Sequence, residues 1–230
     1  MIPRTLAIVL AGALAFACAS PAAAPSPTPT AGPTTAASTT AAPTGTPVPE
    51  PGALVFRVES GKATVRVREQ LAGFSAPNDA VLEVTDVKGA FGVRQDGTFT
   101  PDSKVSVGLE ALRSDSNTRD NFIKGTTLAV RRFPTADFVP VRAVGLPTPL
   151  PATGEWTFQV VGKMTIAGVE KDVSWDVKAR RDGTGITASA KNVPSWKFSD
   201  FGLQVPRVAS VLSIVDEIRL ELELVARQIP

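Results

Sequence analysis

The residue types that most enzymes use for chemistry are scarce in this chain. Among its 230 residues there is no histidine and no tyrosine, and the only cysteine is Cys18. These counts exclude a Ser-His-Asp or Cys-His catalytic arrangement, a histidine-rich zinc site and an internal disulfide. The 24 Lys and Arg nearly balance the 22 Asp and Glu, so we expect no nucleic-acid partner held by bulk charge. Carboxylate chemistry is the catalytic class that remains.

Two sets of charged residues could carry carboxylate chemistry, but both have a simpler structural interpretation. Arg119 and Asp120 fall in the first turn of a short helix predicted after the N-cap residues 114–118, where an acid is favoured by the helix dipole. Asp172 and Asp176 fall on the polar side of one alternating strand and should be solvated. An enzyme would need two acids that converge inside a cleft. We therefore predict no catalytic residue and no metal site.

The N-terminus is predicted to be a secretory signal peptide that ends at a lipidation site. Arg4 precedes an apolar run, residues 5–17, which is shorter than the roughly 20 residues of a membrane-spanning helix. The segment that ends at Cys18 resembles a bacterial lipobox, in which cleavage leaves a lipidated N-terminal cysteine. The hypothesis is that residues 1–18 are a signal peptide and that Cys18 anchors the protein outside the cytoplasm. The alternative is an ordinary secreted protein that is cleaved nearby.

Residues 19–52 are predicted to be a disordered tether. They consist mainly of Pro, Thr, Ala and Ser, with almost no charge and no large apolar side chain. Such a segment cannot bury enough apolar surface to offset the loss of backbone entropy. The folded domain is therefore predicted to comprise residues 53–230, which is an ordinary size for one domain.

The clearest structural pattern is a long β-hairpin over residues 155–181. Trp156, Phe158 and the following alternate residues of the first run are apolar, and so are Val173, Trp175 and the alternate residues of the second. Alternation with a period of two predicts strands with one buried side. Residues 167–170, which include a glycine, are predicted to reverse the chain.

Alternation elsewhere predicts an all-β fold with one short helix. The clearest further strands are residues 54–58, 62–70, 104–112, 135–144, 183–191 and 216–227. With weaker candidates between residues 80 and 92 we expect eight or nine strands, which the short connections make mostly antiparallel. A sheet with one apolar face must close or pack on a second sheet. We predict an extended antiparallel eight-stranded β-barrel. Its interior is either filled by side chains or holds one slender ligand.

The inward positions are the candidate ligand-binding residues. Small residues among them, such as Gly162, Ala111, Ala179, Ala188 and Ala190, are predicted to leave room along the barrel axis. The predicted lining residues are Val107, Leu109, Phe138, Phe158, Val160, Gly162, Met164, Trp175, Val177, Leu220 and Leu222. For any single position, ordinary core packing is the competing interpretation. Trp196, Phe198 and Phe201 are interpreted as either a plug at one end of the barrel or a satellite hydrophobic cluster.

Several motifs, taken in order, resemble the YceI-like family. They are residues 89–91, 117–120 followed by Phe122, 133–138, 162–173 and 200–203. The resemblance implies a lipocalin-like barrel that binds one long isoprenoid, such as a polyprenyl chain or quinone tail, outside the cytoplasm and without catalysis. No cofactor is implied other than that lipid. The expected partners are the isoprenoid lipid and, through the N-terminal anchor, the membrane; a homodimer is compatible with the sequence. The alternative function is a structural or adhesive surface domain with a solid barrel.

Overall fold

The structure, a computed structural model, describes residues 50–230. The predicted signal peptide, Cys18 and most of the predicted tether lie outside the described residues. Within residues 50–230, no helix has the length and apolar character needed to cross a membrane.

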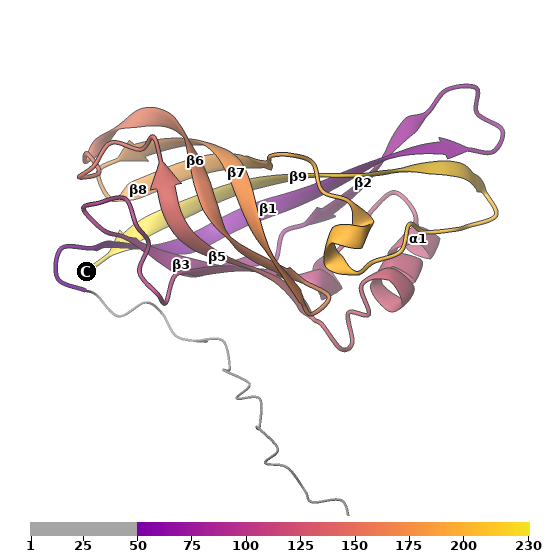
Figure 1. The fold of residues 1–230 in the computed structure, drawn as a ribbon, viewed down its shortest axis with the longest axis horizontal. Helices are drawn as coiled ribbons and strands as arrows, with labels where there is room; N and C mark the ends of the chain where they lie inside the picture. The colour runs from indigo at the N-terminus through magenta and orange to yellow at the C-terminus, as the bar shows by residue number, and fades with distance from the viewer. Residues whose placement is uncertain (1–49) are drawn as a thin grey trace, which may run out of the picture. The chain divides into compact units, whose positions relative to one another are not determined.

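The described residues form one antiparallel sheet that closes on itself (Figure 1). Its strands are β1 (Leu54–Leu71), β2 (Asn78–Val84), β3 (Val87–Val93), β4 (Lys104–Gly108), β5 (Thr135–Val144), β6 (Thr153–Ile166), β7 (Val169–Asp182), β8 (Gly185–Asn192) and β9 (Val211–Ile229). They pair in the order β2-β1-β3-β4-β5-β6-β7-β8-β9, and β1 also pairs with β9. Closure pairs the long strand edges that would otherwise be exposed.

The barrel has eight strand positions because β2 and β3 share one of them. Residues 54–57 of β1 pair with β3, and residues 63–69 of β1 pair with β2. Only Thr85 and Asp86 separate β2 from β3, so both run along the same edge of β1. The predicted eight-stranded antiparallel barrel with one short α-helix is confirmed.

The first strand is longer than the sequence pattern predicts. Residues 54–58 and 62–70 were expected to form two strands, but they belong to the continuous β1, which pairs with β9 along its length. The pairing shifts register between Val58 and Ser60, as in a β-bulge. A bulge keeps the strand paired while it interrupts the alternation of side chains. That interruption is why the pattern looks like two strands.

The predicted hairpin is confirmed as β6 and β7, whose register runs from Thr153 opposite Asp182 to Ile166 opposite Val169. The strands extend to a turn of only two residues, which is shorter than the predicted reversal. Ala167 and Gly168 have φ angles of 49° and 80°. Positive φ at both central positions is the geometry of a type I′ turn, which matches the twist of paired strands.

Helices cover one end of the barrel. Helix α1 (Asn117–Phe122) starts after Ser116, whose side chain accepts a hydrogen bond from the Arg119 amide, and it continues into a π-helix, η2 (Ile123–Thr127). The 3-10 helix η3 (Phe198–Phe201) lies at the same end as α1, opposite the end that carries the C-terminus (Figure 1).

The predicted strand over residues 104–112 is wrong in its second half. Strand β4 ends at Gly108, and Leu109–Ala111 form the 3-10 helix η1. The amide of Leu109 still donates to the carbonyl of Pro134, in register with the pairing of β4 and β5, but the amide of Leu112 donates back to the carbonyl of Leu109 and turns the chain out of the strand. Leu109 stays buried all the same. Period-two hydrophobicity alone does not distinguish a strand from a turn that buries the same side chain.

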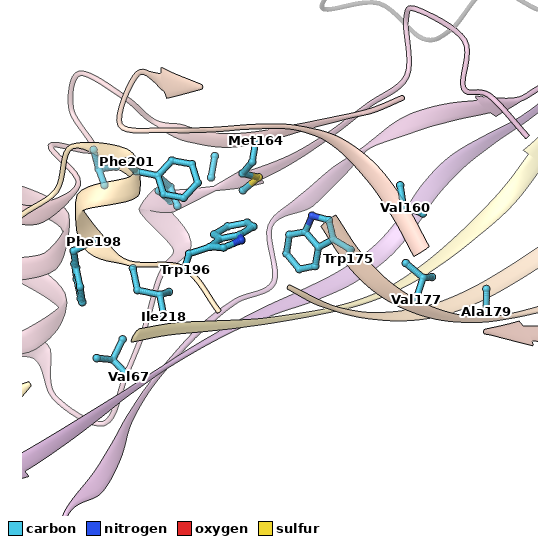
Figure 2. Packing of buried hydrophobic residues seen from close by; sticks show 13 residues of the cluster. Val67, Val160, Met164, Trp175, Val177, Ala179, Trp196, Phe198, Phe201 and Ile218 are labelled. Carbon is cyan, nitrogen blue, oxygen red and sulfur yellow. The ribbon is translucent and has the colours of Figure 1, made fainter. Parts of the chain in front are cut away.

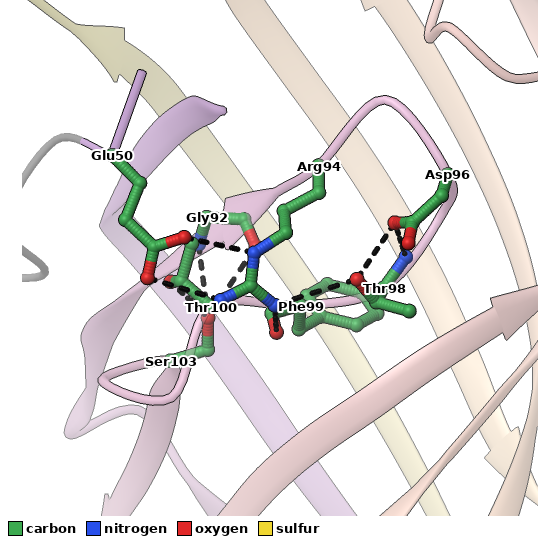
Figure 3. A network of polar contacts seen from close by, with 8 residues as sticks. All are labelled: Glu50, Gly92, Arg94, Asp96, Thr98, Phe99, Thr100 and Ser103. Carbon is green, nitrogen blue, oxygen red and sulfur yellow. Dashed lines mark hydrogen bonds and ion pairs between the residues drawn. The ribbon is translucent and has the colours of Figure 1, made fainter. Parts of the chain in front are cut away.

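An ion pair holds the residues before β1 against the barrel. Arg94, after β3, donates from Nε and Nη2 to the Glu50 carboxylate at 2.8 and 3.0 Å, and from Nη1 to the Phe99 carbonyl at 2.7 Å (Figure 3). The hydrogen bonds that the Arg94 guanidinium donates to Glu50 raise its pKa. Glu50, which falls within the predicted tether, is therefore tied to the barrel.

Candidate ligand-binding site

The inner face of the barrel surrounds an apolar cavity of about 270 Å³. Its wall runs from Phe198 and Phe201, at the helical end, to Leu150 and Ile186, at the opposite end. The volume is larger than that of a cavity of about 150 Å³ known to bind benzene in another protein. It is close to the lower end of the roughly 300–1,000 Å³ of typical small-molecule sites.

All but one of the predicted lining residues lie at the cavity wall. These are Val107, Leu109, Phe138, Phe158, Val160, Met164, Trp175, Val177, Leu220 and Leu222. Of the small residues predicted to leave room, Ala179, Ala188 and Ala190 also line the cavity. The alternation in the sequence therefore identifies the residues that the fold brings together. Whether they bind a ligand stays a prediction.

Gly162 does not line the cavity. A Cβ atom added there would lie 2.8 Å from the Phe138 ring and 2.4 Å from the Val139 carbonyl oxygen. The ring of the neighbouring strand therefore occupies the space above this glycine. The absence of a side chain at Gly162 leaves room for the Phe138 ring, so the predicted gap is filled.

Aromatic side chains close the cavity at the helical end. The ring centroids of Trp175 and Trp196 are 5.4 Å apart, and those of Trp196 and Phe201 are 5.1 Å apart. Figure 2 shows Trp196 between Trp175 and the η3 segment that carries Phe198 and Phe201. Trp196, Phe198 and Phe201 belong to the main core cluster and line the cavity at this end, so they are not a separate satellite cluster; together with Trp175 they are called the aromatic plug below. The Nε1 atom of Trp175 is buried without a hydrogen-bond partner among the described residues.

A buried ion pair also lies at the helical end. Glu69 follows Val67 on the inward side of β1 and is 4% exposed. Its carboxylate accepts a hydrogen bond of 2.8 Å from Nη2 of Arg119, which also pairs with Asp115. Asp120 is buried and accepts a hydrogen bond from Ser114 at 2.7 Å. Arg119 and Asp120 thus have structural partners, as predicted, but Glu69 shows that one acid does face inward.

Arg181 lies at the opposite end and was missed in the sequence. It is 7% exposed, lines the cavity, and stacks over the Phe56 ring at 5.4 Å. The signal was present, because Arg181 continues the inward series of Trp175, Val177 and Ala179 on β7. Burial lowers the pKa of the Arg181 guanidinium, although an arginine remains charged in proteins.

The outward carboxylates of the hairpin lie in solvent, as predicted. Asp172 is exposed on β7, and its carboxylate lies 3.9 Å from Nζ of Lys163. Asp176 accepts a hydrogen bond of 2.9 Å from Gln159. Neither acid faces the cavity, so these two residues form no acid/base pair there.

Solved structures share this architecture. A polyisoprenoid-binding domain from Saccharophagus degradans superposes with a TM-score of 0.58 at 11% identity, covering 76% of this chain and 99% of that one. A YceI protein from Campylobacter jejuni superposes with a TM-score of 0.51 at 19% identity, covering 70% and 91%. At these identities the likeness shows the fold.

Sequence comparisons extend the likeness to the family. UPF0312 proteins of Pseudomonas putida strains W619 and GB-1 are each 32% identical over 128 residues, which is 50% of this chain and 63% of theirs. The chain thus spans less than two thirds of the length of these curated relatives. Residues 56–226, nearly the whole barrel, match the YceI-like domain. The chain therefore belongs to the YceI-like family.

Proposed function

We propose that the barrel binds the apolar chain of an isoprenoid lipid, a polyprenyl chain or quinone tail, and carries or sequesters it outside the cytoplasm without catalysis. The observation that carries this proposal is the cavity, whose wall is almost entirely apolar from the helical end to Arg181. Each CH₂ group moved from water into such a cavity contributes about 0.8 kcal/mol. A long hydrocarbon chain can therefore bind tightly with few polar contacts.

The comparisons support the same class of ligand. The Saccharophagus degradans domain that shares this fold is described as polyisoprenoid-binding. Met164 lines the cavity beside the aromatic plug, and a methionine side chain repacks readily around a flexible guest. A cavity of about 270 Å³ can thus adapt to a prenyl chain.

The proposal is tested by filling the cavity. Ala188 lies on the inner face of β8 at the cavity wall, and Ser189 beside it is exposed on the outer face. We expect Ala188→Phe to weaken binding of geranylgeraniol about tenfold or more, because the ring occupies space that the chain needs. Ser189→Phe is the matched control and should bind like the unmodified chain. All three tryptophans of the chain line the cavity, so their fluorescence can report the titration.

A second measurement identifies the natural ligand. Mass spectrometry of an organic extract should find an isoprenoid lipid in protein purified from membrane-containing cells. The alternative, a structural or adhesive domain with a solid barrel, predicts no extracted lipid and equal behaviour of the two phenylalanine variants. That result would overturn the binding function.

The extracytoplasmic location is part of the same proposal and rests on residues 1–18. If Cys18 is lipidated, cells given a labelled fatty acid should incorporate the label into the protein. Cys18→Ser should remove the label and release the protein from the membrane fraction. A protein that is never labelled, or that stays in the cytoplasm, contradicts the anchor.

A further inference from the structure

Arg181 is a buried cation at the end of an otherwise apolar cavity. Two other charged residues contribute to the cavity wall, Arg180 and Glu221. Alternation on β7 and β9 places their side chains on the outer face, where Glu221 lies 3.6 Å from both Arg66 and Lys191. Among the described lining residues, Arg181 is therefore the one whose charged group is buried on the inner face.

The hydrogen-bond acceptors around Arg181 are all neutral. Nε donates to the Gly183 carbonyl at 2.8 Å, and Nη2 donates to Oε1 of Gln228 at 2.8 Å. Nη1 donates to the carbonyls of Leu150 and Pro151 at 3.3 and 3.2 Å, which are long for such bonds. Within residues 50–230, no carboxylate lies within ion-pair distance of Arg181. A guanidinium carries five N–H donors, so four acceptors leave one Nη2 hydrogen unused.

Neutral acceptors alone do not compensate the positive charge of the Arg181 guanidinium. Burying a charge costs much more free energy than burying a dipole, and a facing opposite charge offsets part of that cost. Elsewhere in this barrel the fold provides such a charge, since Glu69 neutralises Arg119 at 2.8 Å. At Arg181 the missing negative charge has an open space beside it, the cavity itself.

We propose that Arg181 binds an oxyanion, a phosphate or a carboxylate, at the end of the apolar chain that occupies the cavity. This inference rests on the proposed lipid-binding function and names the class of head group. The guanidinium presents a planar fork that matches both oxyanions. The hydrocarbon chain extends from it towards the aromatic plug. Arg181 lies six positions after Trp175 on β7, which corresponds to about 20 Å of strand.

The test compares pairs of ligands that have the same hydrocarbon chain and differ in the head group. The full-length protein is titrated with geranylgeranyl phosphate and, separately, with geranylgeraniol. A second pair of titrations uses palmitate and hexadecanol. We expect each anionic ligand to bind about tenfold tighter than its alcohol, because a hydrogen bond between charged groups contributes more free energy than one to a neutral hydroxyl. A preference in the phosphate pair alone identifies a phosphate head, and a preference in the carboxylate pair alone identifies a carboxylate.

Variants then assign the preference to one residue. Arg181→Met should bring each acid and its alcohol to the same affinity, and Arg181→Lys should retain part of the preference. The matched control is Lys178→Met, which removes an exposed cation from the outer face of the same strand and should leave the preference unchanged. A preference that persists in Arg181→Met would overturn the assignment.

The outcomes separate this inference from the function on which it rests. If the unmodified protein binds the acid and the alcohol of both pairs equally well, the head-group site is wrong and lipid binding stands. If it binds none of the four, the lipid-binding function fails first. Should Arg181→Met fail to fold, the ligand pairs on the unmodified chain and on Arg181→Lys still decide the question.

Discussion

The two ends of the barrel each hold an arginine, but in different ways. At the helical end Arg119 faces the Glu69 carboxylate at 2.8 Å, next to an aromatic plug. At the other end Arg181 is more deeply buried, yet it donates hydrogen bonds only to carbonyl and amide oxygens. One charge is neutralised within the fold and the other is not. The helical end is therefore interpreted as a closed structural base, and the Arg181 end as the place where a ligand supplies charge.

The largest expected effect is the loss of the aromatic plug. Phe201 is 1% exposed and contacts Trp196 at a centroid distance of 5.1 Å. Phe201→Ala should lower the free energy of unfolding by about 3–5 kcal/mol, because it leaves a cavity in a packed core. The control is Phe74→Ala, which truncates a side chain that is 67% exposed and should cost less than about 0.5 kcal/mol. Equal effects in urea unfolding would show that the helical end is not a packed base.

A smaller effect is expected from breaking the ion pair. Arg119→Met leaves the Glu69 carboxylate buried without its main partner, and should lower the free energy of unfolding by about 3 kcal/mol. The double variant Glu69→Leu, Arg119→Met should recover much of that loss, since no unpaired charge remains.

The same measurement on Arg181→Met sharpens the comparison. We expect the free energy of unfolding to fall by about 1–2 kcal/mol. This change removes hydrogen bonds to neutral acceptors but leaves no buried opposite charge without a partner. A loss larger than that of Arg119→Met would indicate that Arg181 is mainly a structural tie. Denaturant titrations of the four proteins provide the comparison.

The smallest effect concerns pH at the helical end. Asp200 in η3 accepts hydrogen bonds from Lys171 at 2.7 Å and from the Lys197 amide at 2.8 Å, and these lower the pKa of its carboxyl. A lowered pKa favours folding when the carboxyl is ionised, so this stabilisation is present above about pH 4 and is lost as the pH falls further. Asp200→Asn should cost about 0.5–1 kcal/mol at pH 7.

The Asp200 difference should shrink towards zero on acidification. Unfolding of both proteins at pH 7 and at about pH 3 gives the comparison. A difference that is unchanged between these two conditions would contradict the role of the Asp200 charge.

Alternation predicted much of the site because side-chain direction in a strand depends only on position. Phe158, Val160 and Met164 share a face of β6 wherever that strand lies, so they reach the same cavity wall. The prediction for Gly162 was wrong because it depends on a neighbour. The Phe138 ring comes from β5, and only the pairing of β5 with β6 places it over the glycine.

Sequence alone determined the all-β class, the long hairpin and the identity of the inward residues, because these follow from local periodicity. Only the tertiary structure decided that β1 is continuous and that the inward face encloses a space. It also decided which buried charges have partners. Glu69 and Arg119 are fifty positions apart in the chain, and closure of the barrel brings them together. Among the described residues, Arg181 donates no hydrogen bond to a carboxylate: apart from the nearby Gly183 carbonyl, its partners are brought to it from distant segments, and all of them are neutral.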